Sequence, residues 1–313
     1  MDKKTPPFFL VGVERSGTTM LRLMLTHHPD IFFHHEFVYS VEKISPSGHF
    51  PEKKDYLAYL ELDRIFKSEN LNIIDSDSYV EIVDDFLSQL KKKNNKPVLG
   101  ATVHRNFQFL PKIWPNAKYI HMVRDPRDVA FSYVNKGWAG HVWTAADAWL
   151  QTEKTWRVFQ ESIKPCDYCT VHYEDLVRDP RGELQKICEF MGVSYSEDML
   201  LYDKNSTFSA PDLALIGQWK KKNSNDVRLI ESKLKEQMIA SGYTVSNEDL
   251  NVSCFYDYYL RALSRVRKQT FSIRRYGLCL QLLDILSRRV LPLPFFRKFV
   301  RLKINEINSK YIK

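Results

Sequence analysis

No stretch of the 313 residues is apolar for long enough to cross a membrane. A spanning helix needs about 20 consecutive apolar residues, and no run approaching that length occurs. The start of the chain also lacks the apolar core of a secretory signal, because a proline-flanked strand begins within its first ten residues. These absences argue against helical membrane spans and lead us to expect a cytoplasmic protein.

Cysteines are few, odd in number and scattered along the chain: Cys166, Cys169, Cys188, Cys254 and Cys279. This pattern argues against a disulfide framework and is typical of reduced thiols in a reducing compartment. Cys166 and Cys169 have the spacing of half a zinc site, but no second pair follows at metal-binding spacing. The sequence therefore predicts no metal centre.

The excess of positive charge is confined to one end of the chain. With 44% apolar and 27% charged residues, the composition is that of a globular protein. Of the 46 Lys and Arg residues, 14 lie between Arg261 and Lys313, together with only 2 of the 38 Asp and Glu residues. The sequence thus predicts one domain over residues 1–260 and a basic amphipathic extension over residues 261–313.

Residues 7–28 have the pattern of a strand, a glycine-bearing turn and a helix. The apolar run Phe8–Val11 is typical of a strand buried on both faces, and a largely apolar helix follows the turn. In such a unit, backbone N–H groups of the turn and the positive end of the helix point at the same place. We expect an anion to bind there.

The turn matches a phosphate-binding P-loop at every position except one. Gly12, Gly17 and Thr19 fit the pattern G-x-x-x-x-G-K-[ST], but Thr18 stands where the lysine should be. Without that lysine, hydrolysis of ATP or GTP is not expected. Arg15 supplies a cation inside the loop, and its planar guanidinium suits a phosphate or sulfate group.

The rest of the first 260 residues alternates short apolar strands with amphipathic helices. Further strands are expected at residues 31–33, 98–103, 117–123 and 168–172, and helices at residues 80–90, 144–162, 181–191 and 226–240. Alternation of this kind predicts an α/β fold with a P-loop-like, doubly wound parallel sheet flanked by helices. Ligands of such sheets bind beyond the carboxyl ends of the strands.

Two more strand ends carry suitable chemistry. Arg124 follows one predicted strand, and Ser132 lies one to two helical turns further on, which suits a second phosphate. Tyr173 and the two acidic residues after it follow another strand and offer an aromatic, polar wall. Two anion sites and an aromatic wall indicate a nucleotide with phosphate at both ends.

Two long motifs resemble those of the sulfotransferases that use 3′-phosphoadenylyl sulfate (PAPS), over roughly residues 7–240. Residues 13–19 (VERSGTT) resemble the family's 5′-phosphosulfate loop, and residues 123–132 (VRDPRDVAFS) resemble its 3′-phosphate motif. Residues 173–176 and 216–220 support the resemblance more weakly. It implies an enzyme that moves a sulfuryl group from PAPS to an acceptor hydroxyl or amine by in-line displacement, without a metal.

The resemblance also implies roles for individual residues. The 5′-phosphosulfate would be held by Arg15, Ser16, Gly17, Thr18 and Thr19, and the 3′-phosphate by Arg124 and Ser132. Arg15 would also stabilise charge on the sulfuryl oxygens. Tyr173 would lie near the adenine, and Lys220 or one of the two lysines after it would close on the 3′-phosphate.

Two residues compete for the role of general base that removes the acceptor proton. Glu36 has the spacing from Arg15 that the catalytic glutamate has in the similar tyrosylprotein sulfotransferases, and the sequence slightly favours it. His104 resembles the catalytic histidine of cytosolic sulfotransferases at the equivalent strand end. Ala101 and Thr102 stand where many relatives carry a lysine, so assistance of the leaving group by lysine is not expected here.

The basic extension has several interpretations. Arginines flanking short apolar runs are typical of a segment that lies on an anionic membrane. Contact with an anionic polymer, docking of a partner subunit, or simple packing on the domain would suit the same pattern. We expect a cytoplasmic enzyme with a membrane-peripheral tail.

The acceptor and the competing functions are left open by the sequence. A carbohydrate or glycolipid acceptor is favoured because the tail would hold the enzyme at a membrane. A P-loop-like nucleotide kinase, with Asp125 as its magnesium-binding acid, is the alternative enzyme, and a non-catalytic nucleotide-binding module is the third hypothesis. Nucleic acid is not an expected partner, because aromatic side chains for base stacking are not interleaved with the basic residues.

Overall fold

A computed structural model describes residues 5–205, 211–246, 250–289 and 293–309. Its centre is one five-stranded parallel sheet in the order β2-β3-β1-β4-β5. The strands are β1 (Phe8–Val11), β2 (Ile31–His34), β3 (Val98–Val103), β4 (Lys118–Val123) and β5 (Tyr168–His172). The predicted parallel α/β fold is confirmed.

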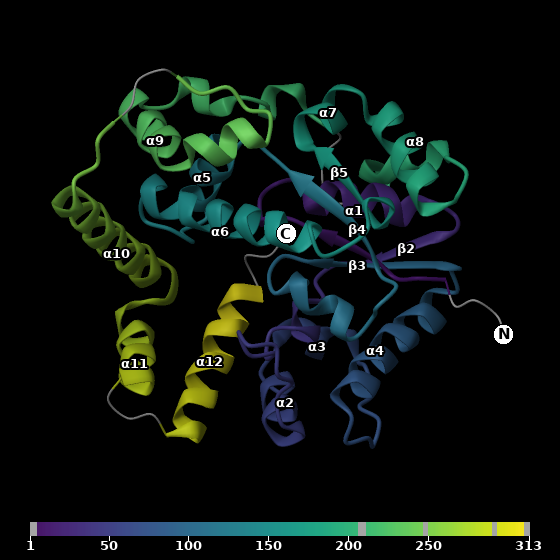
Figure 1. Cartoon of the computed structure of the whole chain (residues 1–313). Coiled ribbons are helices and arrows are strands. Elements are labelled where there is room, and N and C mark those ends of the chain that lie inside the picture. The colour runs from purple at the N-terminus through teal and green to yellow at the C-terminus, as the bar shows by residue number, and fades with distance from the viewer. Residues whose placement is uncertain (1–4, 206–210, 247–249, 290–292, 310–313) are drawn as a thin grey trace.

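Helices cover both faces of the sheet (Figure 1). Within β1, Phe8 and Leu10 belong to one core with α1 and α8, whereas Phe9 and Val11 belong to another with α4 and the end of α6. Alternate side chains of a strand point to opposite faces, so a continuously apolar strand is buried on both. The helices of this domain are α1 (Thr18–His27), α2 (Lys53–Leu60), α3 (Arg64–Glu69), α4 (Tyr79–Asn94), α5 (Pro126–Asn135), α6 (Val142–Gln160), α7 (Tyr173–Arg178), α8 (Pro180–Met191) and α9 (Ser224–Ala240).

Strand order decides where the loops meet. β1 lies in the middle of the sheet, and the chain adds β3 on one side of it and β4 on the other. The loops that leave β1, β3 and β4 therefore lie together at a topological switch point, which is where such sheets bind ligands. Short 3-10 helices occur in the connections: η1 (Val38–Ser40), η2 (Phe107–Lys112), η3 (Pro165–Asp167), η4 (Glu197–Asn205), η5 (Leu213–Leu215) and η6 (Gln218–Lys221).

The C-terminal part forms a helical arm of α10 (Cys254–Tyr276), α11 (Leu278–Arg289) and α12 (Pro294–Ser309). Figure 1 shows this arm, coloured olive to yellow, leaving the domain near α9 and returning beside α2 and α3. None of the described helices is long and apolar enough to cross a bilayer.

The arm is fixed to the domain at both of its ends. At its start, Trp143 on α6 donates its indole N–H to Asp257 at 2.6 Å. Near its end, Lys298 pairs with Glu61 at 2.7 Å, and the Asn305 amide lies 3.4 Å from the carbonyl oxygen of Leu62.

The described part of the tail predicted over residues 261–313 is helical except at Gly277 and Leu293, and residues 290–292 and 310–313 lie outside the described part. The boundary predicted after residue 260 falls inside α10, because the helix begins at Cys254, seven residues before the basic region. The division into two domains stays a prediction.

Candidate functional site

The loop between β1 and α1 has the backbone of an anion cradle. Arg15 and Gly17 adopt φ of 71° and 97°, and Gly17 is the residue that precedes the first turn of α1. The buried Ser16 hydroxyl donates to the carbonyl of Val13 at 2.6 Å, which closes the turn from within. Successive N–H groups in such a turn, followed by a helix N-terminus, form a concave anion site.

Atoms packed closely against this loop explain why glycine occupies two of its positions. A Cβ on Gly12 would lie 2.4 Å from the backbone oxygen of Met122, and a Cβ on Gly17 would lie 2.4 Å from the ring of Tyr173. Both glycines also have positive φ. The loop therefore approaches β4 and α7 more closely than any other residue type allows.

The predicted phosphosulfate residues are not equivalent in the structure. Arg15 and Thr19 are exposed, whereas Ser16 and Thr18 are buried, with 0% and 4% of their surfaces accessible. The hydroxyl and the backbone N–H of Ser16 both donate to the Val13 carbonyl, at 2.6 and 3.3 Å, so Ser16 shapes the loop, and its predicted contact with a ligand stays a prediction. Arg15 and Thr19 are the loop side chains that face solvent.

Arg15 joins the two predicted anion sites into one. Its Nε donates to the Ser132 hydroxyl at 3.0 Å, and Arg124 donates to the Arg15 carbonyl at 3.3 Å. Among the described residues no carboxylate lies within ion-pair distance of Arg15. Partial burial and the neighbouring Arg124 lower the pKa of Arg15. The two positive charges repel each other, and an anion bound beside them would offset this repulsion.

Tyr173 contacts the protein on two sides. The guanidinium of Arg124 lies 4.0 Å from the centre of its ring, a cation–π contact, and Gly17 lies against its edge. Only 4% of Tyr173 is accessible, and burial raises the pKa of its hydroxyl. Tyr173 thus orients Arg124, and its predicted place beside the adenine stays a prediction.

A late loop is fastened to α5 by a carboxylate that the sequence did not single out. Asp128 accepts hydrogen bonds from the backbone N–H groups of Gly217 and Trp219 at 2.9 and 2.8 Å. Lys220, the next residue, is exposed beside this anchor. The signal available in the sequence was only the position of Asp128, one helical turn after Arg124.

The acid required by the kinase hypothesis is already engaged. Asp125 accepts hydrogen bonds from the guanidinium of Arg127 at 2.7 and 2.9 Å, and Arg127 also pairs with Glu231 at 2.5 Å. All three side chains are nearly inaccessible. A carboxylate held in a buried ion-pair cluster is not available to a magnesium ion.

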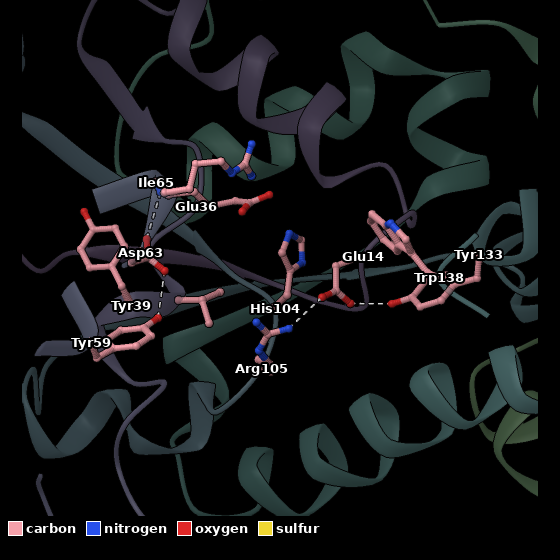
Figure 2. A pocket seen from close by; sticks show the side chains of 12 residues that line it. Glu14, Glu36, Tyr39, Tyr59, Asp63, Ile65, His104, Arg105, Tyr133 and Trp138 are labelled. Atoms are coloured by element: carbon pink, nitrogen blue, oxygen red, sulfur yellow. Dashed lines mark hydrogen bonds and ion pairs between the residues drawn. The ribbon is translucent and has the colours of Figure 1, made fainter. Parts of the chain in front are cut away.

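Next to the loop lies a cavity of about 410 Å³, which we call the central pocket. Figure 2 shows the side chains that line it: Glu14, Glu36, Val38, Tyr39, Tyr59, Asp63, Arg64, Ile65, His104, Arg105, Tyr133 and Trp138. Its volume is in the range of small-molecule sites. The structure therefore brings both predicted bases, Glu36 and His104, into one pocket.

His104 has a defined tautomer. Its Nδ1 lies 2.9 Å from the carbonyl oxygen of Gly12, and a carbonyl can only accept. A neutral His104 thus carries its proton on Nδ1, which leaves the lone pair of Nε2 free. In Figure 2 the imidazole points into the central pocket. This is the geometry of a general base held by a backbone contact.

Glu36 lies in the loop after β2 and reaches the same pocket. No described residue donates a hydrogen bond to its carboxylate. Glu36 interacts with the charge of Arg22 on α1: burial lowers the pKa of Arg22, and the negative charge of Glu36 opposes that shift. Glu36 is therefore a charged wall of the pocket with its oxygens free.

Glu14 is a pocket residue that the sequence analysis missed. Its carboxylate accepts from the Tyr133 hydroxyl at 2.5 Å and lies 3.5 Å from Arg105. Burial opposes its ionisation, but His104, Tyr133 and Arg105 outweigh this effect and lower the pKa of Glu14. A carboxylate ionised beside His104 favours the imidazolium that forms when His104 takes a proton.

One group of side chains has the composition of a metal site. The ligand atoms of His34, His35 and Glu69 lie within 4.8 Å of one another. Burial is the main cause that lowers the pKa of His34 to about 3 and of His35 to about 4, so both imidazoles are neutral near pH 7. The positive charges of Arg22 and Lys93 act on His34 and oppose a cation. That the chain needs no metal stays a prediction.

Comparison with known proteins extends the resemblance beyond single motifs. Residues 6–197 match the model of a sulfotransferase family. A protein-tyrosine sulfotransferase 1 of Danio rerio is 25% identical over 219 residues, which is 65% of this chain and 58% of that protein. An omega-hydroxy-beta-dihydromenaquinone-9 sulfotransferase of Mycobacterium bovis is 24% identical over 255 residues, covering 60% of this chain and 63% of that protein.

Solved structures agree on the fold. The sulfotransferase domain of an olefin synthase from Synechococcus PCC 7002 superposes with a TM-score of 0.52 at 21% identity, covering 79% of this chain and 98% of the domain. The chain spans about 58% of the Danio rerio protein's length. Because the family match covers more than half of the residues, the chain belongs to the sulfotransferase family, and it is a sulfotransferase enzyme.

Proposed function

We propose that this sulfotransferase takes its sulfuryl group from PAPS and transfers it to a hydroxyl group of the acceptor. An amine of the acceptor is the alternative nucleophile. The observation that carries this proposal is the contact between Arg15 and Ser132 at 3.0 Å. It joins the loop after β1 to the site of Arg124, so phosphate groups at the two ends of one nucleotide would meet adjacent guanidinium groups.

The reaction would be an in-line displacement at sulfur. The acceptor oxygen attacks sulfur, the bond from sulfur to the phosphate oxygen breaks, and adenosine 3′,5′-bisphosphate leaves. The acceptor proton would pass to Nε2 of His104. Arg15 and the loop N–H groups would stabilise the charge that develops on the leaving phosphate, as positioned donors do in phosphoryl transfer.

His104 is our choice as the base, with Glu36 as the competitor. The bond from Nδ1 of His104 to the Gly12 carbonyl fixes the ring, and the charge of Glu14 favours the protonated product. Within the described part of the chain, no residue gives Glu36 such an orienting contact. This reverses the slight preference drawn from the sequence, on the ground of geometry.

For the acceptor we propose a carbohydrate hydroxyl. The indole of Trp138 is 45% exposed at the pocket and offers a stacking face. Asp63, Arg64 and Arg105 line the same pocket with charged groups that would bond to hydroxyls. The names of the matched relatives indicate protein tyrosine and a dihydromenaquinone as other acceptor classes, so both belong in the test.

The decisive experiment combines binding and transfer. Adenosine 3′,5′-bisphosphate should raise the melting temperature of the protein more than ATP with Mg²⁺ does. Labelled PAPS should then pass its sulfur to an oligosaccharide, and less to a tyrosyl peptide or a hydroxylated quinol. Greater stabilisation by ATP with Mg²⁺ would overturn PAPS as the donor, and transfer to the peptide or the quinol alone would overturn the carbohydrate.

We also propose that the helical arm holds this enzyme on an anionic membrane surface. Each helix of the arm exposes apolar side chains at helical spacing: Tyr259, Val266 and Ile273 on α10, Leu278, Leu282 and Leu286 on α11, and Phe295, Phe299 and Leu302 on α12. Apolar side chains beside abundant Arg and Lys are the pattern of an interfacial helix.

Sedimentation with phosphatidylglycerol vesicles tests the membrane contact. Replacing Phe295 and Phe299 by serine should reduce sedimentation strongly, because these side chains are 84% and 49% exposed. Val158→Ser is the matched control, since Val158 is 71% exposed but lies on α6. Unchanged sedimentation, or a change in oligomeric state alone, would contradict the proposal.

A further inference from the structure

A row of adjoining cavities leads away from the central pocket along the helical arm. A second cavity, of about 270 Å³, shares Trp138 with the central pocket and is lined by Arg261, Arg265 and Lys268. A third, of about 360 Å³, shares Arg265 and Lys268 and reaches Arg288. Shared lining residues place these cavities next to one another.

The row of cavities continues onto the last helix. A cavity of about 330 Å³ shares Arg288 with the third and is lined on α12 by Arg297 and Arg301. We call the whole feature the basic groove and define it by its cations: Arg261, Arg265, Lys268, Arg288, Arg297 and Arg301. It runs from the wall of the central pocket to the end of the arm.

Most of this positive charge is not neutralised within the protein. Arg261 pairs with Asp147 and Asp257, and Arg288 pairs with Asp284. For the other four cations, no carboxylate of the described residues lies within ion-pair distance. On α10, residues 261, 265 and 268 are spaced so that they share one face of the helix. The groove therefore presents four cations without an ion-pair partner among the described residues, next to one lining carboxylate, Asp284.

Building on the proposed function, we infer that the basic groove binds the chain of an anionic polysaccharide, whose terminal or internal hydroxyl enters the central pocket. Guanidinium groups pair well with carboxylate and sulfate groups, which such a chain carries at intervals. The 23 residues of α10 span about 35 Å, so the groove fits an extended polymer rather than a single sugar.

The lining favours a polysaccharide over an acidic peptide. Between the cations the groove is lined by polar side chains such as Gln269, Ser272 and Gln281. Peptides are usually held by a free strand edge or by apolar anchors in a helix groove. The groove lies between helices, and the exposed apolar side chains of the arm, such as Val266 and Leu282, do not line it.

Binding without any donor nucleotide tests this inference separately from the proposed function. The probe is a fluorescent polygalacturonate oligosaccharide, with dextran of equal length as the neutral polymer and poly-glutamate as the acidic peptide. We expect polygalacturonate to bind, with an affinity that falls steeply as salt rises, and dextran to bind at least tenfold more weakly.

The variants reverse charge inside and outside the groove. Arg265→Glu with Lys268→Glu should weaken polygalacturonate binding tenfold or more. Lys154→Glu with Arg274→Glu makes the same change in net charge at exposed positions outside the groove and should change binding less than twofold. Sulfation of a short neutral sugar should remain unchanged in both double variants.

Three outcomes would overturn the inference: equal binding of dextran, equal loss in both double variants, or tighter binding of poly-glutamate than of polygalacturonate. Failure of the proposed function would look different. In that case no acceptor would be sulfated from PAPS, while the loss of polygalacturonate binding in the groove variant would still be measured.

Discussion

The Nε of Arg15 lies 3.0 Å from the hydroxyl of Ser132, although 117 positions separate the two residues in the sequence. One residue comes from the loop after β1 and the other from α5, and strand order brings them together. The contact also withdraws one donor of Arg15 from solvent and fixes its guanidinium over the mouth of the loop.

Arg15→Ala should lower turnover with PAPS by a factor of roughly 10² to 10³, the usual cost of losing a positioned charge-stabilising donor. Ser132→Ala should have a smaller effect, mainly on the affinity for adenosine 3′,5′-bisphosphate. Steady-state kinetics and calorimetry measure the two effects. Arg178→Ala, which removes an exposed cation paired with Asp175, is the control. Equal losses in Arg15→Ala and the control would contradict the role of Arg15.

His104→Ala should reduce turnover by roughly 10² to 10⁴, the range for removal of a general base. Glu36→Gln should reduce it less, because Glu36 lacks the orienting bond that holds His104 to Gly12. Thermal stabilisation by adenosine 3′,5′-bisphosphate should survive in both variants and shows that each is folded. The reverse order of losses would make Glu36 the base.

Gly12→Ala should destabilise the protein by about 2 kcal/mol or more, because the new methyl group meets the Met122 carbonyl at 2.4 Å and φ is 147°. Gly192→Ala is a matched control: φ is 75°, but no atom lies within 4 Å of the new methyl group. It should cost only about 1 kcal/mol. Urea unfolding measures both, and equal effects would show that the close approach to β4 is unimportant.

Stability should fall as the pH drops from about 7 toward 4. Burial, with Arg22 nearby, lowers the pKa of His34 to about 3, whereas the unfolded chain takes up a proton near pH 6.5. The unfolded state thus binds more protons, and unfolding becomes easier by up to about 1.4 kcal/mol per pH unit. His35 is 41% exposed, so its contribution is smaller.

In the variant His34→Gln, the slope of the unfolding free energy against pH should fall by the amount that corresponds to close to one proton. This holds whatever the effect of the substitution on stability at neutral pH. Urea unfolding at several pH values gives the slopes. An unaltered slope in His34→Gln would mean that His34 titrates normally in the folded protein.

Asp128→Asn should weaken binding of adenosine 3′,5′-bisphosphate by about tenfold, because an amide cannot accept from both Gly217 and Trp219. The late loop and Lys220 would then lose their anchor. Lys220→Ala in the same assay separates the two effects: if Lys220 contacts the nucleotide, its loss should account for part of the change. Normal affinity in Asp128→Asn would remove the loop from the binding site.

The parallel sheet and its functional edge were predictable because local patterns determine them. Apolar runs of four to six residues, such as Phe8–Val11, are strands buried on both faces, and Gly12 and Gly17 mark a turn that only glycine can make. Once the strands are parallel, their carboxyl ends meet, and Arg124 does reach the carbonyl of Arg15, whereas their roles toward phosphate stay predictions.

The missed features depend on contacts between distant segments. Glu14 is held in the pocket by a hydrogen bond from Tyr133, and Asp128 anchors the late loop by a hydrogen bond from Trp219. Neither partner lies nearby in sequence. Tyr173 stands at the start of α7 with the guanidinium of Arg124 over its ring, a contact that the sequence did not indicate, and its place beside the adenine stays a prediction. Charge composition located the basic extension but not the start of its helix.

The ion pair between Lys298 and Glu61 links the last described helix to a segment near the start of the chain. During synthesis, α2 and α3 leave the ribosome long before α12 exists to meet them. The central pocket is lined by residues between Glu14 and Trp138, whereas the far end of the basic groove depends on α12. The groove that we infer binds the acceptor is thus held against the domain by a contact between residues 237 positions apart.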